Sequence, residues 1–324
     1  MNNIQTFHIQ SHDFDEISAS LPRWNQTYHQ LSAGAFFGDV DYVQVNGMEI
    51  FEMHWEQVIH YQGLTPPGTI AFGLPKSLAG ESRYLNRMIS DNELLIQHCG
   101  SEGDLIGSRN FIIQVLTVSD QRFFDKVNQL TGLDKRQQIC SLNRIPLPAL
   151  TAENLRVQFQ ALIQKPININ SISSYSPAFV NILAENLLNT IANIVIPENI
   201  EQTTLRLKRQ RQLVKKAEDY VLNYRAAPPR LDALCTNIGT SERSLRGAFN
   251  ACTGISVGAY LKTFRLNQVR RELKSRSLDS IRVQDVAFTW GFSHLGQFAA
   301  DYRQLFGESP SETLRHGNKF QLAV

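Results

Sequence analysis

The chain has 324 residues, with 32 Lys and Arg against 30 Asp and Glu. At about 150 residues per domain, this length predicts two domains. The amino terminus is polar, and no run approaches the roughly 18 apolar residues of a membrane span, which predicts a cytoplasmic protein without membrane contact. Four cysteines lie far apart without a Cys-x-x-Cys pair, which disfavours a zinc site or a disulfide framework.

The charge is divided unevenly along the chain. Up to Thr204 there are 12 basic and 20 acidic residues, a balance of −8. From Leu205 to Gly317 there are 19 basic and 10 acidic residues, a balance of +9. An acidic half joined to a basic half is typical of a sensory module attached to a nucleic-acid-binding module. A basic surface that binds an acidic partner is the alternative.

The amino half reads first as strands and then as helices. From Phe36 to Val118, alternating segments are separated by turn signals such as Asn46-Gly47, which predicts an antiparallel barrel or sandwich. Helical periodicity follows at Phe123–Leu130, Leu155–Ile163 and Phe179–Val195. The last helix carries an apolar stripe that is either a dimer seam or part of the core: Leu183, Leu187, Leu188 and Ile191.

The histidines of the amino half do not form a metal-binding pattern. His54, His60 and His98 are scattered instead of clustered with a carboxylate at ligand spacing. We therefore expect no metal, no cofactor and no covalent chemistry.

The basic half opens with a predicted helix, Leu205–Tyr224, and continues as an imperfect internal repeat. Gly239 and Ser241 recur 52 residues later, and five further positions recur after 53 residues: Leu245, Phe249, Gly254, Ser256 and Leu261 match Phe298, Tyr302, Gly307, Ser309 and Leu314. Each copy reads as a short helix, a glycine turn and a second amphipathic helix. This is the helix-turn-helix pattern, which binds DNA in the major groove.

The buried stripe of each second helix determines which residues point outward. In the first copy Leu231, Leu234 and Ile238 should face the core, as should Leu245, Ala248, Phe249 and Cys252. The outward residues are then Arg243, Arg246, Gly247 and Asn250, and Arg and Asn can read guanine and adenine edges. In the second copy Leu295, Phe298, Tyr302 and Phe306 should be buried, leaving Gly296, Gln297, Ala300 and Arg303 outward.

Between the copies, Val257–Lys274 predicts one continuous helix. Its 18 residues would span about 27 Å, close to the ~34 Å between successive major grooves. One chain could therefore read two adjacent grooves.

The segment Arg230–Arg315 resembles the AraC/XylS family of bacterial transcription regulators. The resemblance rests on Thr-Ser-Glu-Arg-Ser-Leu at 240–245, Phe264-Arg265-Leu266, Asp285-Val286-Ala287, Trp290-Gly291-Phe292 and Phe306–Ser311. It implies a two-lobed domain that binds double-stranded DNA, with RNA polymerase as a further partner of an activator. The residues expected to contact DNA are Ser241, Arg243, Ser244, Arg246, Asn250, His294, Gln297 and Arg303. Gly247 and Ala300 depart from the longer polar side chains of many members.

The amino half resembles the cupin-like sensor domains of this family, through Gln30–Gly38 and Gly63–Gly68. This resemblance implies a small-molecule effector and a homodimer. The expected fold class is therefore α+β: an antiparallel cupin-like barrel with flanking helices in residues 1–200, and an all-α domain of two helix-turn-helix units joined by a long helix in residues 201–324.

Arg83 and Arg87 are a candidate effector site. Four residues apart, they would share a face of one extended strand and could clasp a phosphate. The spacing is similar to the Arg-x-x-x-Arg element of PilZ domains, which implies a cyclic dinucleotide, although the partner motif is absent. Two solvated arginines are the alternative.

Other functions remain open at this stage. A DNA-repair methyltransferase fused to such a domain would need a reactive, metal-bound cysteine, and none of the four is so placed. A non-specific architectural DNA-binding protein and a regulator controlled by a protein partner are the remaining alternatives.

Overall fold

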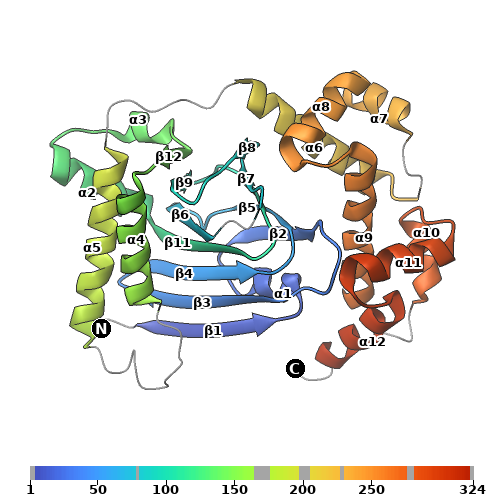
Figure 1. Ribbon diagram of the computed structural model, residues 1–324, viewed down its shortest axis with the longest axis horizontal. Coiled ribbons are helices and arrows are strands. Elements are labelled where there is room, and N and C mark those ends of the chain that lie inside the picture. Colours follow the sequence, from blue (N-terminus) through green and yellow to red (C-terminus); the bar gives the residue numbers. More distant parts are fainter. Residues whose placement is uncertain are drawn as a thin grey trace. The chain divides into compact units, whose positions relative to one another are not determined.

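The computed structural model describes residues 4–77, 80–163, 176–196, 205–226, 230–275 and 281–321. They group into two units (Figure 1). The first draws on Met1–Tyr28, Phe37–Tyr84 and Met88–Thr204, and the second on His29–Phe36, Leu85–Arg87 and Leu205–Val324. The first is rich in strands and the second is helical, so the predicted α+β class is confirmed. The expected boundary at residues 200 and 201 lies outside the described residues.

Two sheets form the framework of the first unit in the described part of the chain. The seven-stranded sheet has the order β1 (Gln5–Ser11), β3 (Gly38–Val45), β4 (Met48–Trp55), β11 (Phe111–Ser119), β6 (Thr69–Ser77), β9 (Glu93–Gln97) and β12 (Arg144–Pro146). The five-stranded sheet has the order β2 (Asn25–Gln30), β5 (Ile59–Leu64), β10 (Gly103–Gly107), β7 (Arg83–Tyr84) and β8 (Arg87–Met88). The pairs within the larger sheet run antiparallel.

The hairpin between β3 and β4 shows how local sequence sets the register. Asn46 and Gly47 have φ angles of 51° and 74°, which Asn and Gly adopt more readily than other residues. The turn lies at the Asn46-Gly47 signal, and the pairing of Val45 with Met48 follows directly from its two-residue length. Two strands before Phe36, β1 and β2, and the short helix α1 (Phe14–Ala19) were not anticipated.

Strand alternation gives the larger sheet two different apolar faces. Ile50 on β4, Phe72 on β6 and Leu116 on β11 belong to one core cluster that also contains side chains of the helices α2 (Asp120–Thr131), α4 (Ala149–Leu162) and α5 (Pro177–Val195). Their immediate neighbours along the strands point to the opposite face. Figure 1 shows α4 and α5 side by side next to the sheet. A short helix, α3 (Arg136–Cys140), connects α2 to β12.

The apolar stripe of α5 belongs to this core. Leu187, Leu188 and Ile191 are fully buried in the cluster, while Leu183 is partly buried against it. Among the described helices, α5 is the one that is long and apolar enough to cross a membrane by length and composition. Its packing on the sheet and on α4 accounts for that apolar character.

The second unit contains seven helices in the described residues, and the last six of them follow the predicted repeat. The seven helices are α6 (Leu205–Asn223), α7 (Leu231–Ile238), α8 (Glu242–Thr253), α9 (Val257–Ser275), α10 (Val283–Thr289), α11 (Leu295–Phe306) and α12 (Pro310–Gln321). Helices α8 and α11 begin 53 residues apart, as do α9 and α12. Gly239, Gly254, Gly291 and Gly307 all have φ between 68° and 75°, where glycine avoids the strain of a side chain.

The long helix α9 supplies side chains to both lobes of this unit. Tyr260, Leu261 and Phe264, in its first half, lie in the core cluster with Leu245 and Phe249 of α8. In its second half, the Arg270 guanidinium lies 5.5 Å from the ring centre of Phe306 on α11. The predicted helix Val257–Lys274 is therefore observed, one residue longer.

Residues 29–36 complete the second unit. The backbone N–H of Gln30 donates to Asn267 Oδ1 at 3.0 Å, and Asn267 Nδ2 donates back to the Gln30 carbonyl at 3.0 Å. The N–H of Gly34 donates to the carbonyls of Gln304 and Leu305 near the end of α11, both at 3.1 Å. Both Gln30 and Asn267 are fully buried. The sequence analysis assigned this segment to the amino-terminal domain. A hydrogen-bonded pair between residues so far apart in the chain leaves no periodic signal in the sequence.

We predict that Leu188→Ala lowers the free energy of unfolding of the first unit by about 2 to 5 kcal/mol, because it opens a cavity in a closed core. Leu130→Ala is the matched control, since Leu130 of α2 is 45% exposed and its loss should change stability by less than about 0.5 kcal/mol. Denaturant unfolding followed by tryptophan fluorescence would measure both. Equal effects of the two substitutions would show that α5 is not a core helix.

Candidate nucleic-acid interface

Helix α8 is capped at both ends by residues that the sequence pattern identified. The Ser241 hydroxyl accepts the backbone N–H of Ser244 at 3.2 Å, and Gly254 ends the helix in the left-handed conformation. Leu245, Ala248, Phe249 and Cys252 are buried, as predicted. The N-cap and the buried stripe together fix the rotation of the helix about its axis.

The outward face of α8 carries the predicted polar residues. Arg243, Arg246, Gly247 and Asn250 are all exposed. The Arg246 guanidinium lies 3.3 Å from the Glu242 carboxylate one turn earlier, and both side chains are at least half exposed. An exposed pair of this kind is weak, so Arg246 can exchange Glu242 for a base edge.

Helix α11 repeats this design with one difference from the prediction. Phe298, Tyr302 and Phe306 are buried, but Leu295 is 36% exposed, so its expected burial is wrong. Leu295 is the first residue of α11 and, at the repeat spacing of 53, corresponds to the exposed Glu242 of α8. An apolar residue at this place in the repeat lies outside the core, which begins at Phe298.

The exposed face of α11 contains a polar chain of contacts. Gln297 Nε2 donates to Asp301 Oδ1 at 3.0 Å, and the other Asp301 oxygen lies 2.6 Å from Lys262 Nζ on α9. Arg303, two residues after Asp301, is also exposed. The sequence analysis did not identify Asp301, although its spacing of four residues from Gln297 is the signal that would have shown it.

Helices α8 and α11 differ in charge when residues 53 positions apart are compared. Arg243 and Arg246 of α8 correspond to Gly296 and Ala299 of α11, all four of them exposed. Ser244 corresponds to Gln297, and Asn250 to Arg303. Ser241 and His294 lie at the two N-termini, where backbone N–H groups favour an anion such as phosphate. The His294 side chain makes no capping hydrogen bond.

The structure does not place Arg83 and Arg87 on one extended strand. Leu85 and Asn86 have φ angles of 50° and 67°, and the chain reverses there between β7 and β8. The assumed shared strand face is therefore wrong, because a two-residue hairpin turn separates the arginines. Arg83 Nη2 lies 3.1 Å from the Glu81 carboxylate. Phosphate binding by these arginines stays a prediction.

The three scattered histidines each have a separate partner. His54 Nδ1 lies 2.9 Å from Asp39, His60 Nε2 lies 3.0 Å from Asp104, and His98 Nε2 lies 2.6 Å from the Leu142 carbonyl. Burial lowers the pKa of His98, which favours its neutral form. No group of three potential metal ligands occurs among the described residues.

Known proteins are similar to parts of this chain. Residues 234–316 match a family model described as a helix-turn-helix domain. The probable thc operon regulatory protein of Rhodococcus erythropolis is 37% identical over 103 residues, which cover 32% of this chain and 31% of that protein. The XylDLEGF operon transcriptional activator of Pseudomonas putida is 30% identical over 141 residues, 44% of this chain and 42% of that protein.

The matched regions thus span less than half the length of these curated relatives. Among solved structures, that of the AraC-like transcriptional activator CuxR aligns over 88% of this chain and 100% of its own, with 12% identity and a TM-score of 0.45. The family match, residues 234–316, extends across both helix-turn-helix copies, from α7 into α12. The chain is thus similar in its carboxyl-terminal region to transcription regulators of the AraC/XylS type.

Proposed function

We propose that the chain is a sequence-specific, DNA-binding transcription regulator of the cytoplasm, controlled by a small effector bound in its first unit. The observation that carries the proposal is the exposed cationic face of α8, with Arg243 and Arg246 above a buried stripe. Guanidinium and amide groups on such a face match the donor and acceptor pattern of base edges in the major groove.

The two helices have unequal roles in this proposal. Helix α8 presents two arginines and Asn250, so the first lobe specifies the sequence. On α11, Gln297 is held by Asp301, and the carboxylate repels the DNA backbone. Arg303 then contacts a phosphate, and the second lobe mainly contributes affinity. Helix α9, at 19 residues, is long enough to set the lobes near successive grooves.

The different polar residues on α8 and α11 favour sequence-specific binding over a non-specific architectural role. A protein that binds only the DNA backbone needs cations but no base-reading amide on the same face. A small effector, a homodimer and contact with RNA polymerase complete the proposal. Contact with the polymerase is in keeping with the similarity to a protein named as a transcriptional activator.

The homodimer is assigned to the amino-terminal unit. Helices α4 and α5 expose large apolar side chains away from the core: Leu150 at 74%, Val157 at 60%, Ile182 at 56% and Phe179 at 42%. Large exposed apolar residues on two neighbouring helices favour a protein interface. A second copy of the chain is the proposed occupant.

Arg246→Ala should reduce discrimination between the cognate site and single-base variants, because loss of a bidentate base contact costs about 1 to 3 kcal/mol at one base pair. Arg303→Ala should weaken all sequences by a similar factor and make the salt slope shallower by about one unit. Competition binding with each base pair of a selected site changed in turn measures both effects. Uniform loss from Arg246→Ala with altered preference from Arg303→Ala would reverse the roles of the lobes.

Substitutions at Ser241 separate helix capping from phosphate contact. Ser241→Asp keeps a good N-cap and should change the free energy of unfolding by less than about 0.5 kcal/mol, yet its charge should lower DNA affinity. Ser241→Ala, which adds no charge, should cost about 1 kcal/mol of stability. Calorimetric unfolding and DNA titration would test both variants. Unchanged affinity of the Asp variant would place Ser241 away from the DNA backbone.

Ile182→Lys should shift the full chain from dimer to monomer in sedimentation equilibrium, because the charge would be desolvated at the interface. Asn193→Lys adds the same charge at an exposed position near the end of α5 and should leave the dimer intact. A monomeric parent protein, or equal behaviour of the two variants, would contradict the proposed interface.

A further inference from the structure

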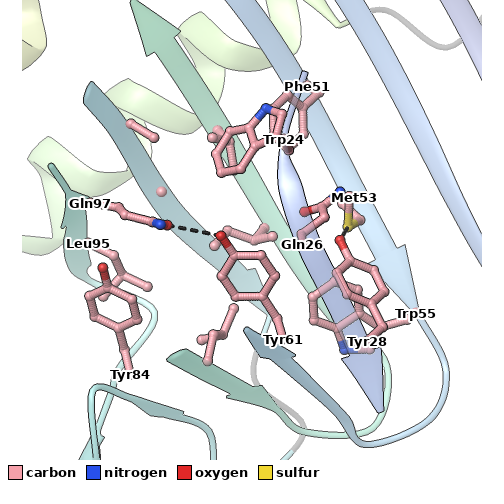
Figure 2. A pocket seen from close by; sticks show the side chains of 15 residues that line it. Trp24, Gln26, Tyr28, Phe51, Met53, Trp55, Tyr61, Tyr84, Leu95 and Gln97 are labelled. Carbon is pink, nitrogen blue, oxygen red and sulfur yellow. Dashed lines mark hydrogen bonds between the residues drawn. The ribbon is translucent and has the colours of Figure 1, made fainter. Parts of the chain in front are cut away.

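A cavity lies inside the first unit, between its two sheets, and Figure 2 shows the side chains that line it. It contains about 540 Å³ of space free of protein atoms, part of it open to solvent. The larger sheet contributes Phe51, Met53 and Trp55 from β4, together with residues of β6, β9 and β11. The smaller sheet contributes Tyr28, Tyr61, Tyr84 and Leu105.

Two small residues of β6 line this space. Ala71 and Gly73 face the cavity, whereas Ile70, Phe72 and Leu74 alternate with them and pack into the helical core. At Gly73 a Cβ would lie 2.9 Å from the Ile113 side chain, so Ile113 already occupies the space beside it. A larger side chain at position 71 would extend into the cavity.

Aromatic rings make up much of the wall. The Tyr28 ring meets those of Trp55 and Tyr61 edge to face, with centres 5.8 and 6.0 Å apart. The Trp24 ring meets Phe51 in the same way at 5.8 Å. Trp55, Tyr28 and Phe51 are buried, while Trp24 and Gln26 are partly exposed and form the more accessible side. Ring edges and faces of this kind favour a flat apolar guest.

The hydroxyl groups of the wall already donate to protein atoms. Tyr61 Oη donates to Gln97 Oε1 at 3.0 Å, and Tyr28 Oη to the Met53 sulfur at 2.9 Å (Figure 2). Tyr84 Oη donates to the Ile96 carbonyl at 2.9 Å. Gln97 Nε2 donates to the carbonyl of Gly63 at 2.8 Å. The Tyr61 hydroxyl has therefore committed its hydrogen to Gln97, and toward a guest its oxygen can only accept.

None of the described lining residues carries a formal charge. Burial raises the pKa of Tyr61 and of Tyr28 far above their ordinary values, so both hydroxyls stay neutral. A carboxylate or phosphate entering this space would lose its hydration without gaining a cation in return, and that exchange is strongly unfavourable. A neutral ring compound loses little hydration there.

We propose that this cavity binds a small, uncharged ring compound that carries one hydrogen-bond donor, with its ring against Tyr28 and Trp55 and its donor on the Tyr61 oxygen. The inference rests on the proposed effector-controlled function and names the chemical class of the effector. It differs from a cyclic dinucleotide at Arg83 and Arg87, which would carry phosphate charges and which lies outside this lining.

Three probes of similar shape test the class on the full chain: 4-ethylphenol, ethylbenzene and 4-ethylbenzoate. Two of the three tryptophans of the chain, Trp24 and Trp55, line the cavity, so intrinsic fluorescence reports occupancy, with calorimetry as a second measurement. We expect 4-ethylphenol to bind most tightly, ethylbenzene several-fold more weakly, and 4-ethylbenzoate at least about tenfold more weakly than 4-ethylphenol.

Two variants locate the site. Ala71→Leu should fill the cavity and abolish binding of both neutral probes. Tyr61→Phe keeps the ring and should weaken the binding of 4-ethylphenol by about fivefold while leaving the binding of ethylbenzene unchanged. Because the Phe variant must be folded to bind ethylbenzene, it tests the site even if the Ala71→Leu protein misfolds. Equal or tighter binding of 4-ethylbenzoate, binding by neither neutral probe, or unchanged binding of 4-ethylphenol by the Tyr61→Phe variant would overturn the proposal.

The DNA titration of the same protein separates this inference from the proposed function. A chain that binds its DNA site but neither neutral probe keeps the regulator function and loses the effector class. A chain that binds 4-ethylphenol through Tyr61 but shows no salt-sensitive DNA binding keeps the cavity and loses the regulator function.

Discussion

Helix α9 is the constraint on which the DNA-binding unit depends, because one rigid element serves two cores. Its first half places Tyr260 and Phe264 among the residues of α6, α7 and α8, and the buried Tyr260 hydroxyl bonds to Glu218 of α6. Its second half supports the other lobe, where Trp290 Nε1 donates to Glu272 at 2.8 Å. Since an α-helix does not bend easily, the separation and relative rotation of the two lobes are set by its length.

In the first unit, single strands likewise serve two regions, because their alternating side chains face opposite sides of the sheet. In β4, β6, β9 and β11, one set of alternating residues packs on helices while the other lines a cavity, so the same backbone serves stability and binding. Phe72 is fully buried on the helical side, and Ala71, next to it, lines the cavity on the other. Substitutions on the helical side should therefore affect folding, whereas those on the cavity side should affect the ligand.

The chemistry of the two units matches their proposed occupants. The cavity disfavours a charged guest, because its tyrosines are neutral and no described lining residue is ionised. Helices α8 and α11 instead expose Arg243, Arg246 and Arg303 to water, where the guanidinium groups stay hydrated until a partner such as the proposed DNA replaces the solvent. Exposure decides which charges can act on a partner.

The sequence by itself determined the helix-turn-helix repeat, because helical periodicity, N-caps and glycine C-caps are local signals that recur in register. Gly239, Gly254 and the outward Arg243 and Arg246 could be placed from such signals alone. Only the tertiary structure decided that Arg83 and Arg87 lie across a turn, that Leu295 is exposed, that Gln30 pairs with Asn267, and that Tyr28, Tyr61 and Ala71 surround one cavity. These features join residues distant in the chain or depend on one turn conformation, so no short-range pattern encodes them.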